Sequence, residues 1–228
     1  MRLSKFLTLS VAMTRNQAKF FIRKGRVSVD GKLVINPDLE LADTSHVVFD
    51  DKQISVATRR YFLIHKPVSY ACTTKETEHT SILRLLEDRP QEHYYYFANL
   101  LEPEATGLVL LSDDAQWTNR IQRRLLNKTW VYDVRLKSII SELQLGQIKK
   151  AYLKNLEKQV GSIIEVQKQS KKTLSVSIKK VHLREILDVL ATADLTVESF
   201  HLRQLGNLTI DNLDEGDYLE MAENEISI

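Results

Sequence analysis

Glu102 and Glu104 lie on either side of Pro103, shortly before the apolar run Leu108–Leu111. A carboxylate at such a place can act as a nucleophile or as a general base when the fold holds it against a substrate. The proline restricts the backbone of Glu102 toward extended conformations. Two interpretations of Glu102 therefore remain: a catalytic carboxylate, or a carboxylate at the protein surface without a catalytic role.

The other reactive side chains favour structural roles. Asp113 and Asp114 precede a helical pattern, so an N-cap is favoured over an acid–base pair. His182 and His201 have no metal-ligating neighbours at useful spacing, and Cys72 falls in a strand pattern that suits a small buried residue. The sequence also lacks a P-loop and a glycine-rich dinucleotide loop, so we expect no metal and no cofactor.

Basic charge gathers in the first part of the chain. The net charge is only +2 over 228 residues, yet residues 1–26 carry seven Lys and Arg side chains and no acidic one. Such one-sided charge suits a phosphate backbone. The single cysteine excludes an intramolecular disulfide framework, and the sequence contains no apolar run of membrane-spanning length. We therefore expect a cytoplasmic protein that does not bind membranes.

Residues 3–9 and 14–24 have the apolar periodicity of two short helices, with Thr14 as the N-cap of the second. The dipeptide Asp30-Gly31 between alternating stretches predicts a hairpin, and residues 46–49 predict a further strand. This arrangement resembles the S4 RNA-binding domain over roughly residues 1–50. The resemblance rests on Arg2-Leu3-x-Lys5-x-Leu7, Thr14-Arg15-x-x-Ala18, Ile22 and Gly25-x-Val27-x-Val29-x-Gly31.

In S4 domains the second helix and the loop after it face structured RNA, so the resemblance implies contacts from this part of the chain. Such contacts go mainly to phosphates and position the protein without reading bases. The side chains that we expect to contact RNA here are Arg2, Lys5, Arg15, Lys19, Arg23, Lys24 and Arg26.

Residues 50–60 are polar and lack periodicity, so we divide the chain there into domains 1–57 and 58–228. In the second domain we predict strands at 61–66, 70–74, 108–112, 129–136, 162–168 and 173–180, and helices at about 115–126 and 182–193. We expect residues 70–74 to pair with 61–66. The mixed order favours an α+β fold with a large, mostly antiparallel mixed sheet flanked by helices.

This second domain is similar to the bacterial ribosomal RNA pseudouridine synthases, in the branch that modifies single sites. The matching stretches are Tyr61-Phe62-x-x-His65-Lys66-Pro67, Gly107-Leu108-x-Leu110-Leu111-Ser112-Asp113-Asp114, Lys128-Thr129-Trp130 and Leu205-Gly206. Enzymes of this family break the bond between the sugar and N1 of uridine and rejoin the sugar to C5, without a metal or redox cofactor. They use an Asp, an Arg that helps to displace the flipped base, a Tyr and a basic partner of the Asp.

The resemblance assigns the place of the Asp to Glu102, of the Arg to Leu100 and of the Tyr to Trp130. Glutamate is one methylene longer than aspartate, and a displacement of about 1 Å can cost roughly a hundredfold in rate. Leucine has no donor, and an indole N–H cannot accept a proton. Lys180 aligns with a basic residue of the family, and Leu183 stands at the place of a Gln. Glu185 and Ile186 stand at the places of two basic residues, and Leu202 at the place of a second Arg, with Arg203 one position further on.

These replacements favour an RNA-binding member of the family whose catalysis is impaired or lost, with a role in ribosome biogenesis. The alternative is an active ribosomal RNA pseudouridine synthase, an isomerase, that uses Glu102 as the catalytic carboxylate. A third hypothesis is a scaffold for a protein partner. We expect a monomer that binds ribosomal RNA or an assembling ribosomal subunit, with further RNA contacts from Lys66 and Lys128.

Overall fold

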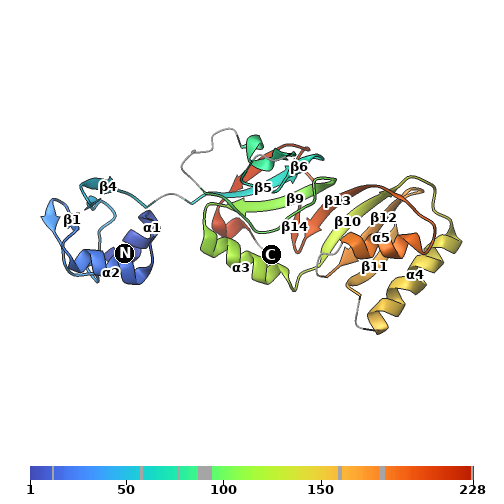
Figure 1. The fold of residues 1–228 in the computed structure, drawn as a ribbon, viewed down its shortest axis with the longest axis horizontal. Helices are drawn as coiled ribbons and strands as arrows, with labels where there is room; N and C mark the ends of the chain where they lie inside the picture. Colours follow the sequence, from blue (N-terminus) through green and yellow to red (C-terminus); the bar gives the residue numbers. More distant parts are fainter. Residues whose placement is uncertain are drawn as a thin grey trace. The chain divides into compact units, whose positions relative to one another are not determined.

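The computed structural model describes residues 1–11, 13–56, 59–75, 78–86, 94–158, 161–179, 183–226 and 228. The chain forms two compact units, Met1–Thr58 and Arg59–Ile228, and each is described separately (Figure 1). Within the described ranges, no helix combines the length and the apolar character that crossing a membrane requires.

The first unit has two helices and a four-stranded sheet in the order β2-β1-β3-β4. Its elements are α1 (Leu3–Ser10), α2 (Arg15–Arg23), β1 (Val27–Val29), β2 (Lys32–Leu33), β3 (Val47–Phe49) and β4 (Lys52–Ile54). The Thr14 side chain accepts a hydrogen bond from the backbone N–H of Gln17 and caps α2, as predicted. Asp30 and Gly31 have φ values of 50° and 76°, which a two-residue hairpin turn of the primed type requires.

The second unit contains a nine-stranded mixed sheet with the main order β11-β12-β10-β13-β9-β5-β15, while β8 pairs with β9 and β14 with β13. All pairs in this sheet are antiparallel except β13 with β9. The fold class therefore agrees with the prediction. The strands are β5 (Tyr61–Lys66), β8 (Tyr96–Phe97), β9 (Ala105–Ser112), β10 (Trp130–Leu136), β11 (Ile163–Lys168), β12 (Thr173–Ile178), β13 (Val197–Leu205), β14 (Leu208–Thr209) and β15 (Tyr218–Met221).

Helices pack against this sheet. The helix α3 (Ala115–Leu125) lies against β9, and α4 (Glu142–Glu157) lies beside β11 and α5 (Leu183–Ala191) (Figure 1). The Asp114 carboxylate accepts from the backbone N–H groups of Gln116 and Trp117, so it caps α3 as predicted. Two short 3₁₀ turns complete the unit, η1 (Ile82–Leu85) and η2 (Glu223–Glu225).

The predicted pairing of residues 70–74 with 61–66 is wrong. The short strand β6 (Tyr70–Ala71) pairs in parallel with β7 (Thr80–Ser81) and stays outside the large sheet. The reason is that both edges of β5 are already taken, by β9 on one side and by β15 on the other. Neither pairing partner is a neighbour of β5 in the sequence, so local patterning could not reveal them.

Gly107 marks the place where β9 meets the parallel strand β13. Its φ is +124°, and a Cβ there would lie 2.4 Å from the carbonyl oxygen of Leu202 and 2.6 Å from its backbone nitrogen. No side chain fits into this gap, because real Cβ atoms do not approach backbone atoms so closely. Gly107 therefore lets β9 and β13 come together within a few residues of Glu102 in the sequence.

Candidate functional site

Four residues form a row across the middle of the large sheet. Lys66 of β5 pairs with Gly107 of β9, Gly107 with Leu202 of β13, and Leu202 with Tyr132 of β10. The side chains of Lys66, Leu202 and Tyr132 are fully buried. Glu102 lies three residues before β9 and is exposed. The sheet thus forms a buried floor beside the segment that holds the candidate carboxylate.

Lys66 fastens this segment to the end of β5. Its ammonium donates to the carbonyl oxygens of Pro67 at 2.8 Å, Tyr70 at 2.7 Å and Pro103 at 3.4 Å. Burial lowers the pKa of Lys66, while the nearby Cys72 thiol and the carboxylates of Glu104, Glu102 and Glu215 act in the opposite direction. The predicted RNA contact of Lys66 is therefore corrected: its buried ammonium binds protein backbone.

Backbone bonds hold the rest of the segment around Glu102. The backbone N–H of Ser69 donates to the carbonyl oxygen of Pro103 at 2.7 Å, and the backbone N–H of Ala105 donates to the backbone carbonyl oxygen of Glu102 at 3.1 Å. Just before it, the Asn99 amide donates to the Leu108 carbonyl at 2.9 Å and accepts from the Leu110 N–H at 2.9 Å. The segment is consequently ordered without any contribution from the Glu102 carboxylate.

The Glu102 side chain itself has no hydrogen bond or ion pair among the residues that the structure describes. Leu100, at the position assigned to the Arg, points its apolar side chain into solvent with 61% exposure. Leu202, at the other Arg position of the resemblance, is 0% exposed and lies in the sheet floor. Neither leucine offers a donor to a carboxylate or to a phosphate.

Tyr132 is a site residue that the sequence did not identify. Its hydroxyl is buried and has no hydrogen-bond partner among the described residues. Burial raises the pKa of Tyr132, and the negative charge of Glu102 raises it further. The phenol therefore lies within the electrostatic reach of the candidate carboxylate. The one signal in the sequence was its alternation with Trp130 and Val134, which places it on the same side of β10.

Trp130, assigned to the place of the Tyr, is buried beside the end of α3. Its indole N–H donates to the Leu125 carbonyl at 3.4 Å, and its ring is 6% exposed. Trp130 pairs with Leu205, three residues further along β13 than the Leu202 that pairs with Tyr132. Trp130 therefore lies in another row of paired residues than Tyr132, Leu202 and Gly107.

The structure describes only some of the other positions that the resemblance assigns. Lys180 and His182 lie outside the residues that the structure describes. Glu185, where the family has a basic residue, accepts from the backbone N–H of Ser162 at 2.9 Å and of Ile163 at 3.3 Å, and also bonds the Ser162 hydroxyl. Ile186 is buried in the core. Glu185 thus holds the start of β11 to α5, and among the described residues neither Glu185 nor Ile186 interacts with the Glu102 carboxylate.

His201 lies beside a hydroxyl and a second imidazole. Its Nδ1 lies 2.9 Å from the Thr106 hydroxyl, and its ring lies 5.2 Å from the ring of His65. Burial lowers the pKa of His201, and the neighbouring His65 lowers it further. Within the described residues, no group of His, Cys, Asp and Glu side chains has the geometry of a metal site.

The basic side chains of the first unit differ in what they are free to bind. Arg26 forms a bidentate ion pair with Asp50 and stacks over the rings of Phe21 and Phe49, at 4.5 and 5.2 Å from their centroids. Arg2 lies 3.5 Å from Asp38. The side chains of α2 and its C-cap without an ion pair among the described residues are Arg15, Lys19, Arg23 and Lys24.

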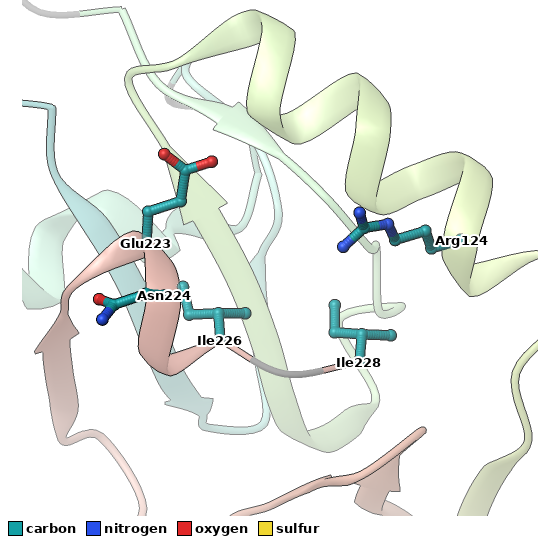
Figure 2. Close-up of a pocket in the computed structure, with 5 residues that line it drawn as sticks. All are labelled: Arg124, Glu223, Asn224, Ile226 and Ile228. Atoms are coloured by element: carbon teal, nitrogen blue, oxygen red, sulfur yellow. The ribbon is translucent and has the colours of Figure 1, made fainter.

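In the second unit, a hollow of about 510 Å³ lies between the end of α3 and the η2 turn (Figure 2). Arg124, Glu223, Asn224, Ile226 and Ile228 line it. Figure 2 shows the Arg124 guanidinium and the two isoleucines directed toward the same space. None of the assigned site residues contributes to this hollow.

Comparisons with known proteins agree with both resemblances. The model of the S4 domain matches residues 1–42. Ribosomal small subunit pseudouridine synthase A of Escherichia coli K12 is 30% identical over 231 residues, covering 100% of this chain and 99% of the relative. An uncharacterized RNA pseudouridine synthase of Aquifex aeolicus is 28% identical, covering 99% and 94%. A crystal structure of a pseudouridylate synthase shares the fold, with a TM-score of 0.58, 22% identity and coverage of 99% and 97%.

Proposed function

Because this chain belongs to the ribosomal RNA pseudouridine synthase family, we propose that it binds ribosomal RNA or an assembling ribosomal subunit and that its ability to isomerise uridine is impaired or lost. One observation carries the proposal. The exposed Glu102 carboxylate has no partner among the described residues, and both positions that the resemblance assigns to arginines hold leucines, Leu100 and Leu202.

The chemistry of the family explains why these leucines matter. Taking a uridine out of its stack costs a few kcal/mol, which the protein must recover by gripping the displaced nucleotide. A guanidinium can hold a phosphate or a base edge with several donors at once. Leu202 instead lies buried between Gly107 and Tyr132 in the row of paired strands, and Leu100 faces solvent. The backbone contacts that hold the segment around Glu102 are present, but the guanidinium donors of the two assigned arginine positions are absent.

RNA binding is the part of the family's activity that the chain retains under this proposal. We assign docking to the S4 domain, residues 1–57, and the synthase-like framework to residues 58–228. Arg15, Lys19, Arg23 and Lys24 on α2 and its C-cap have no ion pair in the part of the chain that the structure describes. They support this assignment, since phosphate contacts supply most of the affinity of such proteins. We further propose that the protein acts as a cytoplasmic monomer on small-subunit RNA.

A second candidate function is an active synthase that uses Glu102, and Tyr132 favours it. The buried phenol has no hydrogen-bond partner in the described part of the chain and feels the charge of Glu102. A phenolic oxygen can accept a hydrogen bond as well as donate one, whereas the indole of Trp130 can only donate. In this case Glu102→Ala abolishes the modification of one uridine, whereas Glu102→Asp preserves it.

Mapping pseudouridines in ribosomal RNA from cells with and without the protein tests the proposal. We expect the two maps to be identical, and we expect the protein crosslinked to ribosomal RNA in the same cells. A pseudouridine that disappears with the protein, and that Glu102→Ala cannot restore, would establish the second candidate. Absence of any crosslink to ribosomal RNA would contradict the binding half of the proposal.

A further inference from the structure

Phe20 is an exposed aromatic side chain on the basic helix α2. It is 55% exposed. The neighbouring Phe21 is less exposed, and its ring centroid lies 5.6 Å from that of Phe49. Phe20 meets Phe21 edge to face, with ring centroids 5.6 Å apart and an interplanar angle of 69°. This contact supports the phenyl ring along one side and leaves much of its surface open to solvent.

One basic side chain lies over this ring, and a second is close to it in the sequence. The Lys24 ammonium lies over Phe20, 5.7 Å from the ring centroid, and Arg23 stands between them in the chain. Neither cation has an ion pair among the described residues. The first acidic residue of the chain is Asp30. A single exposed apolar residue needs no explanation by itself, but an exposed aromatic ring among unpaired cations matches the composition of single-stranded nucleic-acid sites.

We propose that Phe20 is a stacking platform for one unpaired RNA base, with Arg23 and Lys24 binding the phosphates on either side of that base. The inference rests on the proposed RNA binding and adds a base contact to it. Unpaired bases are the ones a side chain can stack on, because the bases of a regular RNA helix are hidden in the stack. Stacking on an aromatic ring tolerates any base, so this contact selects for single-stranded RNA rather than for a sequence.

The test compares the binding of two probes to the full-length protein. One is oligouridylate of about twelve nucleotides, which is within the usual size of a single-strand site. The other is a blunt RNA duplex of the same length. Phe20→Ala should weaken binding of oligouridylate about fivefold or more and change binding of the duplex less than about twofold. Phe20→Trp should retain the affinity. Leu33→Ala is the matched control, since Leu33 is a 68% exposed apolar residue of the same unit outside α2.

Salt dependence separates stacking from charge. Lys24→Ala should reduce the slope of log affinity against log salt by about 0.7, as expected for one phosphate contact to a single strand. Phe20→Ala should lower the affinity at every salt concentration without changing that slope. An effect of Phe20→Ala on the slope equal to that of Lys24→Ala would contradict a stacking role.

A fluorescence measurement reads stacking directly. The native Trp117 and Trp130 are 2% and 6% exposed, so the indole introduced by Phe20→Trp is the exposed one among them. Its emission should be quenched by oligouridylate and not by the duplex. Unchanged emission together with equal affinities of Phe20→Ala and the wild type overturns the inference and leaves the proposed function standing. A wild-type protein that binds neither probe also overturns the inference, whereas the proposed function fails only if the protein does not crosslink to ribosomal RNA.

Discussion

The phenol of Tyr132 and the carboxylate of Glu102 share one electrostatic environment, although thirty residues of chain separate them. Burial raises the pKa of the Tyr132 phenol, and the charge of Glu102 raises it further; Tyr132 also pairs through Leu202 and Gly107 with the strand that follows Glu102. The sheet therefore places the buried phenol within the electrostatic reach of the candidate carboxylate, while Leu100 and Leu202 stand at the two positions that the resemblance assigns to arginines.

Tyr132→Phe removes a buried hydroxyl that has no partner among the described residues. An unsatisfied buried polar group costs about 1–3 kcal/mol, so the variant should be as stable as the wild type or more stable by roughly 1 kcal/mol. Urea denaturation measures this difference. A clear loss of stability would mean that the hydroxyl is bonded in solution, and would favour a working contact with Glu102.

Lys66→Met leaves the carbonyls of Pro67, Tyr70 and Pro103 without their shared donor. We expect the free energy of unfolding to fall by about 2–4 kcal/mol, and amide exchange to rise around Ser69 and Pro103. Lys150→Met, at an exposed position of α4, is the control and should stay within about 0.5 kcal/mol of the wild type. Equal effects of the two variants would refute the fastening role of Lys66.

Gly107→Ala forces a Cβ to within 2.4 Å of the Leu202 carbonyl at a φ of +124°. We expect a loss of about 3 kcal/mol or more, or failure to fold, because both backbone strain and a clash must be relieved. Gly146→Ala in α4 meets nothing within 4 Å and should be neutral or stabilising by up to about 1 kcal/mol. Thermal unfolding of both variants tests the contrast, and similar melting temperatures would speak against it.

Alkaline pH should weaken the protein through Tyr61. Burial, and then the charges of Glu223, Asp114 and Asp113, raises the pKa of Tyr61 to about 12 in the folded state. The unfolded chain loses this proton near pH 10, so the contribution is fully present below pH 10 and declines from there to about pH 12.

Urea midpoints measured between pH 9 and 11 check this slope. Tyr61→Phe should flatten it, and Tyr94→Phe, at a side chain that is 81% exposed, should leave it unchanged. If Tyr61→Phe and the wild type lose stability in parallel over this range, the tyrosine does not carry the effect.

Local features of the fold could be predicted because neighbouring residues determine them. Thr14 and Asp114 cap their helices, and the Asp30-Gly31 turn forms with the expected left-handed backbone. The helix α4 was missed because its apolar stripe is weak: Ile148 is buried, but Leu143 is 75% exposed. Without a clear stripe, sequence periodicity gives no signal.

The candidate site was harder to predict because it depends on strand register. The register of β10 with β13 places Tyr132, and not Trp130, in the row that contains Leu202 and Gly107. The sequence predicted that Lys66 contacts RNA, but the structure buries it, and its ammonium donates to the carbonyl of Pro103 far along the chain. Such contacts arise from tertiary structure and leave no local trace in the sequence.

The central claim is that the framework of a pseudouridine synthase persists here without an effective active site. The most direct measurement incubates the purified protein with a small-subunit ribosomal RNA transcript and maps pseudouridine by chemical labelling and primer extension, with Leu100→Arg/Glu102→Asp alongside. We predict that the wild type binds the transcript and forms no pseudouridine, and that the double variant gains measurable activity. Accumulation of pseudouridine at one position with the wild type, abolished by Glu102→Ala, would contradict the account.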